Sequence, residues 1–598
     1  MHAKLDTPSF SARQLLFSEQ QKSHQQRYNR LAVVRLLVFG ATLVGGWWVY
    51  QISSVWLWLV LGLGFAFFVI LLKKHRQIAR ERDLCRHLAA VNEDEIARLN
   101  LTFLRTETGQ QFAVPNHAYG HDLDIFGDHS LFRLLNRART QAGMNTLAQW
   151  LLYPADDIEI SVRQTAVAEL KPLLDWRQNL EATALLETNT GLPTTFLQNW
   201  IDTPDSTVVR RLRHWRWLPL LTVGLIIAAL TGVLPWVYAI ALLGLHGYIT
   251  AQILPLVKAY SEQSEQLVKT LKSYGILLQQ IERQGFESSK LKQLQRQLSS
   301  TDQRASAAIG SLATLTENLN FRLNVYFFMA VGLPTLWDLQ WITQIENWKK
   351  THRHQLMNWV AVLGEIEALA SLAGFAYANS ATVFPDISAE PLRVEARALA
   401  HPLIAAQQRV ANHFTIKGLG QTVVITGSNM SGKSTFLRTV GLNVVLALAG
   451  SVVCAEAFVC SRLRVYTSMR TQDSLQENTS SFYAELKRLQ TLLQLTQQIN
   501  PPVLYFLDEI LKGTNSADRH NGAKALIAQL HQKSASGFVS THDLELGELA
   551  AQHPFIENYS FNSTFKDGKL LFDYTLTPGI CREFNAAALM RQIGIEME

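Results

Sequence analysis

The residues best suited to chemistry follow a short run of β-branched residues at positions 422–426. They form the pattern Gly-x4-Gly-Lys-Ser, from Gly427 to Ser434, and a segment compatible with a helix comes next. Glycines at these places let backbone amides turn toward a phosphate chain, which a Cβ would obstruct. Lys433 would reach the β- and γ-phosphates, and the Ser434 hydroxyl would bind Mg²⁺. The pattern therefore predicts a phosphate-binding loop for ATP or GTP.

Two carboxylates follow a fully apolar run at residues 503–507. Asp508 would hold the hydration shell of Mg²⁺, and Glu509 would polarise the attacking water. A third run, residues 537–541, ends in His542, whose ring can hydrogen-bond the γ-phosphate or that water. A purely structural role is the alternative for this histidine. Because ligands bind at the carboxyl edge of a parallel sheet, we expect these three side chains to lie beside Lys433.

Residues 473–485 contain Ser480 and Ser481 at the start of another predicted helix. One interpretation is an ordinary helix cap with a Glu in the next turn. The other is an anion-binding helix N-terminus that meets the γ-phosphate of a neighbouring subunit. The residue types alone do not decide between the two.

Length and composition indicate a multidomain membrane protein. The chain has 598 residues, of which 48% are hydrophobic and only 17% charged, and its net charge is +6. Such an apolar balance in a chain of this length favours several domains with membrane segments. The four cysteines are scattered without metal-ligand spacing, which is typical of free thiols in the cytosol. The first 30 residues are polar and do not form a secretory signal.

Two pairs of long apolar runs predict helical hairpins. The first pair occupies residues 31–50 and 55–72, and the second occupies residues 218–234 and 236–257. Each run is near the length that crosses about 30 Å of hydrocarbon as a helix. Short linkers join the runs, and a helix satisfies its own backbone polar groups. For the second pair, which His246 and Gln252 interrupt, buried core helices are the alternative.

Basic residues predict the orientation of the hairpins. They flank the open ends of both pairs, whereas the closed ends carry no charge and have tryptophans nearby. The positive-inside rule then places both termini and all large soluble parts in the cytoplasm, with four spans in the inner membrane. The flanking residues are Lys22, Arg27, Arg30, Arg35, Lys73, Lys74, Arg76, Arg80, Arg210, Arg211, Arg213, Arg216 and Lys258.

Taken together, these motifs resemble the MutS family of ABC-type ATPases. Residues 426–435 read TGSNMSGKST, close to the family's TGPNMGGKST, and residues 507–514 read LDEILKGT, similar to its MDEIGRGT. Residues 540–543 resemble its ATH motif, and residues 473–485 resemble its DDLxxGxSTFxxE. Further segments resemble the family's core and lever regions, at residues 124–131, 143–154, 365–373 and 401–402.

The resemblance implies ATP hydrolysis with Mg²⁺ in composite sites of a homodimer. Each subunit would bind its own nucleotide, with Ser434 and Asp508 at the metal, and Ser480 and Ser481 would reach the partner's γ-phosphate. Catalysis would rest on Lys433, Glu509 and His542. The implied nucleotide-binding residues are Gly427, Asn429, Gly432, Lys433, Ser434, Thr435, Asp508, Ser480 and Ser481.

The resemblance also implies the division of the chain. We expect an α/β P-loop ATPase domain of the ABC type at the C-terminus, preceded by an all-α core and lever domain and two transmembrane helical hairpins. Within the lever we expect a helix over about residues 347–375. The expected segments are 1–30 (cytoplasmic), 31–72 (first hairpin), 73–216 (helical core), 217–257 (second hairpin), 258–390 (lever helices) and 391–598 (ATPase).

Departures from the family pattern bear on the substrate. The sequence leaves no room before the core for a mismatch-reading domain, and the second hairpin falls where the DNA-encircling clamp would sit. The sequence also ends soon after Gly579, so an extended C-terminal dimerisation module is expected to be reduced or absent. Asn478 and Ser431 replace glycines of the family motifs. Mismatch recognition is therefore not supported, whereas DNA binding stays open.

Two functions follow as expectations. The first is a membrane-anchored MutS-like ATPase that couples hydrolysis to lever movement in a DNA-related process such as repair or recombination. The alternative is a membrane mechanoenzyme or signalling ATPase that acts on a protein or lipid partner without DNA. An ABC transporter is a third and weaker possibility, because the hairpins offer few polar groups for a transport pathway and the transporter's LSGGQ pattern is lacking.

Overall fold

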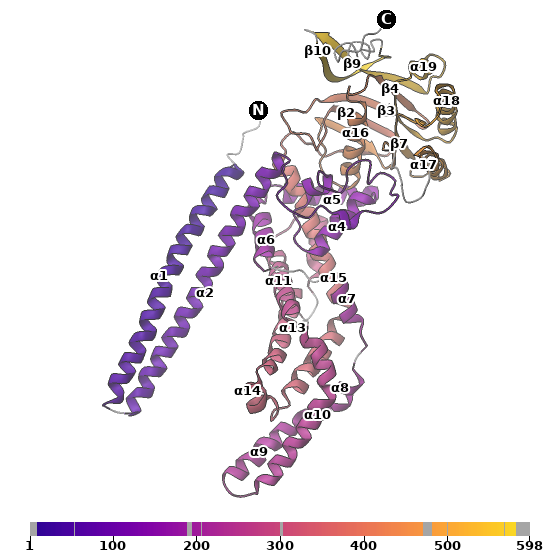
Figure 1. Ribbon diagram of the computed structural model, residues 1–598. Helices are drawn as coiled ribbons and strands as arrows, with labels where there is room; N and C mark the ends of the chain where they lie inside the picture. Colours follow the sequence, from indigo (N-terminus) through magenta and orange to yellow (C-terminus); the bar gives the residue numbers. More distant parts are fainter. Residues whose placement is uncertain are drawn as a thin grey trace.

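Long helices carry two β-sheets at one end of an elongated molecule, and two helical hairpins point away from the sheets (Figure 1). The computed structural model describes residues 9–52, 54–187, 194–204, 206–262, 264–299, 303–470, 481–498, 500–566 and 569–581. The apolar ends of both hairpins lie on the side opposite the sheets.

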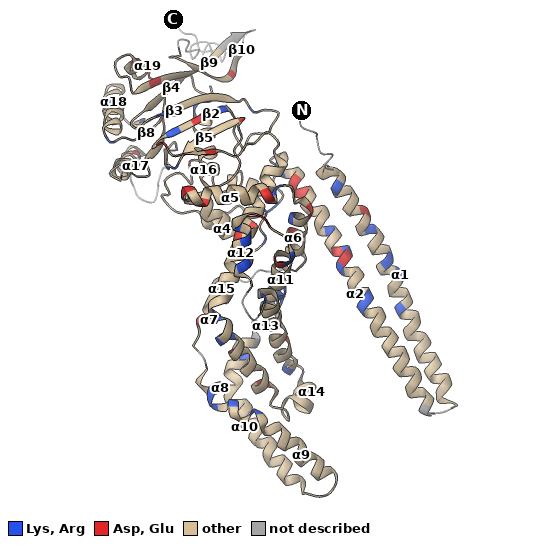
Figure 2. Ribbon diagram, turned by 180° about the vertical axis from the view of Figure 1, so that it is seen from behind, with Lys and Arg blue, Asp and Glu red and all other residues tan. Residues whose placement is uncertain are grey.

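The first hairpin consists of α1 (Phe10–Tyr50) and α2 (Ser54–Leu99). Ser9 begins α1, because its hydroxyl accepts a hydrogen bond of 3.2 Å from the backbone N–H of Ala12. Toward the closed end the side chains are apolar and exposed, and no charged residue colours this part of the ribbon in Figure 2. With 41 residues, α1 is about 60 Å long, twice the hydrocarbon thickness. The basic halves therefore extend beyond any membrane that the apolar halves cross.

The second hairpin is shorter than the sequence predicts on one side. We expected a span over residues 218–234, but α9 (Leu218–Leu230) has 13 residues and rises about 20 Å. It ends where Gly232 adopts a φ of +74° and turns the chain toward α10 (Trp236–Glu262). A 3₁₀ turn, η2 (Arg213–Trp217), and α8 (Thr207–Leu212) precede it. The second hairpin thus combines one long and one short apolar helix.

Four helices of the described residues are long and apolar enough to cross a membrane; three of them contain runs that the sequence predicts, and the fourth replaces the predicted run at 218–234. They are Phe10–Tyr50, Trp56–Leu99, Trp236–Lys258 and Trp337–Ala378. The last of these, α15 (Trp337–Ala378), has 89% of its apolar window buried inside the protein. The apolar composition of α15 therefore reflects packing inside the protein. With 13 residues, α9 is too short to be counted as a membrane-spanning helix.

The lever region is a helical bundle built around α15. This helix begins ten residues earlier than the expected position near 347, and it runs from the second hairpin to the sheets (Figure 1). Gly364 allows α15 to approach α4 closely, because a Cβ there would lie 2.8 Å from the backbone carbonyl carbon and oxygen of Ala142. The other helices of this region are α11 (Ser264–Arg283), α12 (Ser289–Gln297), α13 (Ala305–Asn320), η3 (Phe321–Leu323), α14 (Val325–Phe327) and the π-helix η4 (Phe328–Gly332).

The core region between the hairpins is less helical than expected over residues 100–130, where only the short η1 (Gln110–Phe112) interrupts irregular chain. Five helices follow: α3 (Leu131–Leu135), α4 (Gln141–Leu152), α5 (Asp157–Leu170), α6 (Leu174–Glu187) and α7 (Thr194–Asp202). Tyr119 anchors the irregular stretch, because its hydroxyl donates to the backbone of α4 at Leu152 over 2.7 Å.

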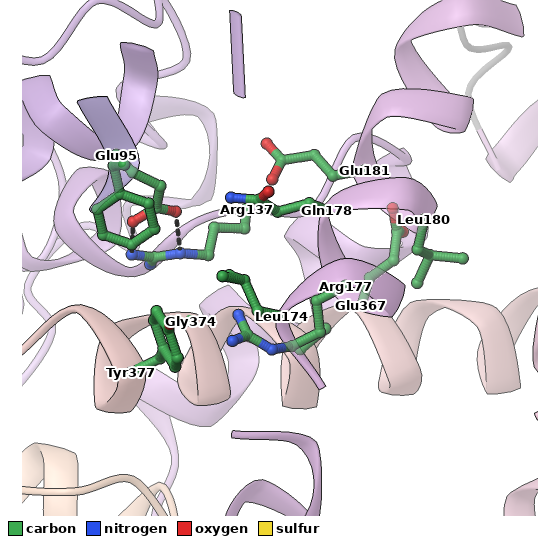
Figure 3. Close-up of a pocket in the computed structure, with 12 residues that line it drawn as sticks. Glu95, Arg137, Leu174, Arg177, Gln178, Leu180, Glu181, Glu367, Gly374 and Tyr377 are labelled. Carbon is green, nitrogen blue, oxygen red and sulfur yellow. Dashed lines mark hydrogen bonds and ion pairs between the residues drawn. The ribbon is translucent and has the colours of Figure 1, made fainter. Parts of the chain in front are cut away.

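Buried charges join the first hairpin to this core (Figure 3). Arg137 donates to Glu95 of α2 over 2.7 Å, and Arg13 of α1 donates to Gln178 of α6 over 3.0 Å. Burial opposes the ionised form of Glu95, but Arg137 and Arg98 outweigh it and lower the pKa of this carboxyl. The cavity between these side chains is about 20 Å³, room for about one water. The cluster thus fastens the base of the hairpin rigidly.

The sheet domain has two layers of strands. A four-stranded sheet has the order β1-β5-β2-β3, and a six-stranded sheet has the order β10-β9-β4-β8-β7-β6. In the larger sheet β10 is antiparallel to β9, and the other neighbours are parallel. β4 and β8 are buried along their whole length, as expected for parallel strands covered on both faces.

The strands of the smaller sheet are β1 (Asp386–Ser388), β2 (Arg393–Leu399), β3 (Asn412–Lys417) and β5 (Ala457–Ser461). Those of the larger sheet are β4 (Thr422–Gly427), β6 (Arg464–Ser468), β7 (Val503–Asp508), β8 (Ser536–Thr541), β9 (Ile556–Lys566) and β10 (Lys569–Pro578). The helices are α16 (Lys433–Leu448), α17 (Ser481–Leu495), α18 (Ser516–Gln532) and α19 (Leu544–Glu548).

Candidate nucleotide-binding site

Three neighbouring strands end at one edge of the larger sheet. β4 lies beside β8, and β8 lies beside β7, all parallel. Their carboxyl ends carry Gly427, Asp508 and Thr541, and Glu509 and His542 follow directly. The structure thus brings together the residues that the sequence analysis expected to meet, at the edge where open α/β sheets bind ligands.

The loop between β4 and α16 requires glycine at two positions. Gly427 has a φ of +154°, and a Cβ there would lie 2.8 Å from the backbone oxygen of Phe561. Gly432 has a φ of +105° and caps the N-terminus of α16. Both conformations are costly for a residue with a side chain. The loop, residues 427–435, therefore wraps closely around the space in front of α16.

Lys433 is buried within this loop. Its Nζ donates to the backbone oxygens of Gly427 over 2.8 Å and Ser428 over 2.9 Å, which leaves one of its three hydrogens for a ligand. Burial lowers the pKa of Lys433, and the nearby carboxylates of Glu509 and Asp508 act in the opposite direction. The backbone of the loop therefore holds the Lys433 ammonium in place before a ligand binds.

Unpaired polar groups line the same loop. Among the described residues, the buried hydroxyls of Ser428 and Ser431 have no hydrogen-bond partner. The first N–H groups of α16 also have no acceptor within their own helix. Buried polar groups without partners cost free energy, and a phosphate chain at a helix N-terminus would satisfy them. The residues present therefore fit a nucleotide phosphate.

A cavity of about 610 Å³ opens beside the loop, within the size range of small-molecule sites. Asn429, Ser434 and Thr435 line it, together with Lys433 and Glu509. Ser434 and Thr435 come from the first turn of α16, where hydroxyls can face a phosphate-bound metal. The cavity has room for more than phosphate, so it can take a whole nucleoside triphosphate.

Glu509 is prepared as an ionised group. Its Oε1 lies 3.2 Å from Nδ1 of His542, and its Oε2 contacts the ammonium of Lys512. Hydrogen bonding to His542, with Lys512, outweighs burial and lowers the pKa of Glu509 to about 2. Asp508 accepts a hydrogen bond from the hydroxyl of Ser540 on the neighbouring strand. Glu509 is therefore a carboxylate at neutral pH.

The far wall of the cavity comes from residues that sequence reasoning did not select. Arg409, Asn412 and Tyr574 line it, and Asn412 joins β3 to β10 by accepting from the N–H of Leu576 over 2.7 Å. His401 lines it too, and burial, Arg438 and Arg409 lower the pKa of this imidazole to about 4. Asn412 and Tyr574 follow no motif spacing, and the packing of β3 against β10 places them here. Arg409 lies before β3 and donates to the backbone oxygens of Pro402 and Ile404.

The segment with the two serines is only partly described. Ser480 lies outside the described residues, and Ser481 is the first residue of α17. Glu485, one turn into α17, accepts a hydrogen bond from the N–H of Leu511, two residues after Glu509. A hydrogen bond therefore links α17 to the loop that follows Glu509.

Comparison with known proteins assigns the sheet domain. Residues 423–595 match the model of MutS domain V, which is a P-loop ATPase domain. Residues 423–595 therefore belong to the MutS domain V family. The chain is 32% identical over 237 residues to the DNA mismatch repair protein MutS of Chloroflexus aurantiacus, covering 38% of this chain and 24% of that protein.

Other MutS proteins match over similar stretches. The DNA mismatch repair protein MutS of Methanococcoides burtonii is 30% identical over 261 residues, 42% of this chain and 29% of that protein. The human MutS protein homolog 4 is 31% identical over 196 residues, 31% of this chain and 20% of that protein. The chain spans about a quarter of the length of the curated relatives it matches.

Proposed function

We propose that this protein is a membrane-anchored MutS-like ATPase that binds ATP with Mg²⁺ and couples hydrolysis to movement of its lever helices. The observation that carries the proposal is the cavity beside residues 427–435, which Lys433 and Glu509 line, with Asp508 directly before Glu509 and His542 3.2 Å from its carboxylate. α15 connects this domain to the apolar hairpins. The expected division into hairpins, core, lever and ATPase, with boundaries at 31, 73, 217, 258 and 391, is part of the proposal.

Each residue of the site has a separate task. The phosphate chain would lie on the loop amides between Gly427 and Gly432, with Lys433 neutralising charge between the β- and γ-phosphates. Ser434 and Asp508 would hold Mg²⁺, which supplies charge neutralisation at the transferred group. Glu509 would accept a hydrogen bond from the attacking water and draw electron density toward its oxygen.

His542 holds the Glu509 carboxylate from one side, and Lys512 holds it from the other. This arrangement fixes the direction in which the carboxylate points before substrate arrives, and preorganisation of this kind lowers the barrier. Asn429 also lines the cavity and would orient a phosphate oxygen or the water.

The site is proposed to be completed by a second copy of the chain. Ser480 and Ser481 would reach the γ-phosphate of the nucleotide bound to the partner, because a helix N-terminus such as that of α17 favours a bound anion. The contact between Glu485 and Leu511 supports coupling, because a change at α17 would move the chain that bears Glu509. ATP bound between two subunits would then control how tightly the two sheet domains close.

The proposed setting is the inner membrane, with four spans and both termini in the cytoplasm. The exposed apolar halves of α1 and α2 and the apolar hairpin α9–α10 support this anchoring. Since these relatives are DNA mismatch repair proteins, we propose that the ATPase domain acts in a DNA-related process. The second candidate is mechanical work on a membrane or protein partner without DNA, which the continuous α15 favours.

Substitution of Lys433 tests the proposed ATP hydrolysis. Lys433→Ala removes the ammonium at the phosphates, so we expect ATP hydrolysis by the purified, nanodisc-embedded protein to fall at least about 100-fold. Lys524→Ala, an exposed lysine of α18, is the matched control and should hydrolyse ATP at the wild-type rate. Wild-type turnover in Lys433→Ala would refute the assignment of the phosphate loop.

The two candidate settings separate in a second measurement. ATPase rates are compared with and without duplex, branched and single-stranded DNA, at low and moderate salt. Stimulation by one DNA form that survives moderate salt favours the DNA-related process, because nonspecific phosphate contacts weaken steeply with salt. An intact basal rate that no DNA form changes favours work on a membrane or protein partner.

A further inference from the structure

An apolar stretch outside both predicted hairpins lies exposed between α13 and α15. Residues 323–337 contain no charged side chain. Several of their large side chains are nevertheless exposed: Val325 is 69% exposed, Tyr326 87% and Met329 63%, whereas Leu336 is buried. Contiguous exposed apolar surface usually marks an interaction site. We call residues 321–336 the 321–336 segment.

Two polar side chains of the 321–336 segment, Asn324 and Thr335, form hydrogen bonds within it. The Asn324 side chain accepts from the N–H of Phe327 over 3.1 Å, and the Thr335 hydroxyl donates to the backbone oxygen of Val331 over 2.6 Å. Arg322, the one charged residue of the segment, pairs with Asp338 over 2.9 Å. Internal satisfaction of this kind is what hydrocarbon demands and water does not.

His246 of α10 ties the segment to the second hairpin. Its Nδ1 lies 3.0 Å from the backbone oxygen of Leu333, and its Nε2 lies 3.1 Å from the hydroxyl of Thr222 on α9. Since a carbonyl only accepts, Nδ1 carries a hydrogen and donates it to Leu333. The Thr222 hydroxyl donates to the backbone oxygen of Leu218 over 3.1 Å and also lies within hydrogen-bond distance of Nε2. Both ring nitrogens of His246 therefore have polar neighbours inside this apolar run.

The position of His246 sets the depth of the segment. His246 lies ten residues beyond Trp236, the first residue of α10, which corresponds to about 15 Å from the closed end of the hairpin. That is half of the hydrocarbon thickness of about 30 Å. In a membrane crossed by α10, the backbone of Leu333 would thus lie near the middle of the bilayer.

The backbone of the segment fits this depth. It passes from a 3₁₀ turn through α14 into a π-helix, a broken helix that membranes tolerate only where its polar groups find partners. His246 provides such a partner for the Leu333 carbonyl.

We propose that the 321–336 segment is a re-entrant membrane segment, inserted beside α9–α10 into the acyl region of the bilayer and held there by His246. The inference rests on the proposed membrane anchoring of α10. It adds a third membrane contact, which belongs to the lever itself, because α15 begins directly after the segment at Trp337. The lever would therefore start inside the membrane.

Site-directed spin labelling tests the insertion. Tyr326→Cys and Met329→Cys each receive a nitroxide in the full chain in nanodiscs, where the native cysteines in the described residues are all buried. Collision with oxygen reports lipid, and collision with a water-soluble nickel chelate reports solvent. Ile240→Cys on α10, 63% exposed, is the lipid reference, and Ile158→Cys on α5, 78% exposed, is the water reference.

We expect the ratio of oxygen to nickel accessibility at positions 326 and 329 to match position 240 and to exceed position 158 several-fold. A ratio like that of position 158 overturns the proposal. Low accessibility to both reagents also overturns it, because a protein partner would then cover the segment. A water-like ratio at Ile240→Cys would instead refute the anchoring of α10, so the two failures are distinguishable.

The role of His246 has its own readout. In the Met329→Cys background, His246→Leu removes the donor to the Leu333 carbonyl, so we expect the nitroxide spectrum to show greater mobility. His246→Asn places an amide N–H near the position of Nδ1 and should restore the restricted spectrum. Equal mobility in all three proteins would show that His246 does not position the segment.

Discussion

Glu509 illustrates how the site prepares one residue for its task. Its backbone adopts a left-handed φ of +49°, which turns the side chain away from the strand that delivers it. Its pKa of about 2 lies below the ordinary value, so the ionised form stabilises the fold fully above about pH 4.5. That stabilisation is lost as the pH falls toward 2. Between pH 5 and 9 the charge of Glu509 therefore does not change, and an acid limb of the rate in that window must come from another group.

Replacement of this carboxylate separates binding from turnover. Glu509→Gln keeps the size of the side chain but removes the charge that polarises water, so we expect turnover to fall about 10²- to 10⁴-fold. Nucleotide binding, measured with a fluorescent ATP analogue, should remain, and a closed dimer should accumulate in ATP. Glu548→Gln, an exposed residue at the end of α19, serves as the control. Normal turnover in Glu509→Gln would show that the proposed role is wrong.

Sequence spacing predicts one half of the site and not the other. Lys433, Asp508, Glu509 and His542 could be chosen because each follows a recognisable strand and the order of strands brings their ends to one edge. The wall of the cavity at Asn412 and Tyr574 could not, because it depends on how β3 meets β10. Pairing of distant strands leaves no local pattern in the sequence.

At the scale of elements, close backbone approach fixes α15 in the core. Gly364 lies against the backbone of α4, and Gly143 of α4 lies against the side chain of Glu367. The Glu367 carboxylate accepts from the N–H of Arg139 over 3.0 Å, just before α4 begins. Two helices that meet through glycine and a buried carboxylate cannot slide past each other freely. They should therefore move as one body.

A methyl group tests this contact. Gly364→Ala forces a Cβ to 2.8 Å from the backbone at Ala142, so we expect a loss of about 1–3 kcal/mol and a thermal midpoint lower by several degrees. Gly310→Ala in α13 is the matched control, because nothing lies within 4 Å of its added Cβ. That control should be neutral or gain up to about 1 kcal/mol of helix propensity. Equal midpoints for the two variants would contradict the close packing of α15 on α4.

The same elements show where apolar runs mislead. Run length and composition do not distinguish lipid from a protein core, so α15 passes the same test as α1 although its window is 89% buried. A turn at Gly232 shortens α9, and residues 321–336 change helix type too often to produce a long regular run. Both depend on contacts with other helices, such as that of His246 with Leu333. No local pattern in the sequence indicates these contacts between distant helices.

In the whole molecule, the sheet domain and the 321–336 segment lie at opposite ends of α15. α15 has 42 residues and is about 63 Å long, and it connects the 321–336 segment to the start of β1 (Figure 1). The buried charges around Arg137 fasten the first hairpin to the same bundle (Figure 3). A stiff helix with both ends held can transmit a change of nucleotide state to the membrane. By thermodynamic reciprocity, the membrane can then also change the affinity for nucleotide.

A break in α15 tests this coupling. Thr351 is exposed near the middle of the helix, and Thr351→Pro removes a backbone hydrogen bond there and kinks the helix at a cost of about 3 kcal/mol. In wild-type protein we expect the apparent affinity for ATP to differ between nanodiscs of thin and thick bilayers, because mismatch strains the inserted helices. In Thr351→Pro the affinity should become independent of thickness, while basal hydrolysis continues. Thr351→Ala keeps the helix intact and should retain the wild-type dependence. If Thr351→Pro still responds to thickness as the wild type does, the signal travels by a route other than α15, and the lever proposal fails even though the ATPase site stands.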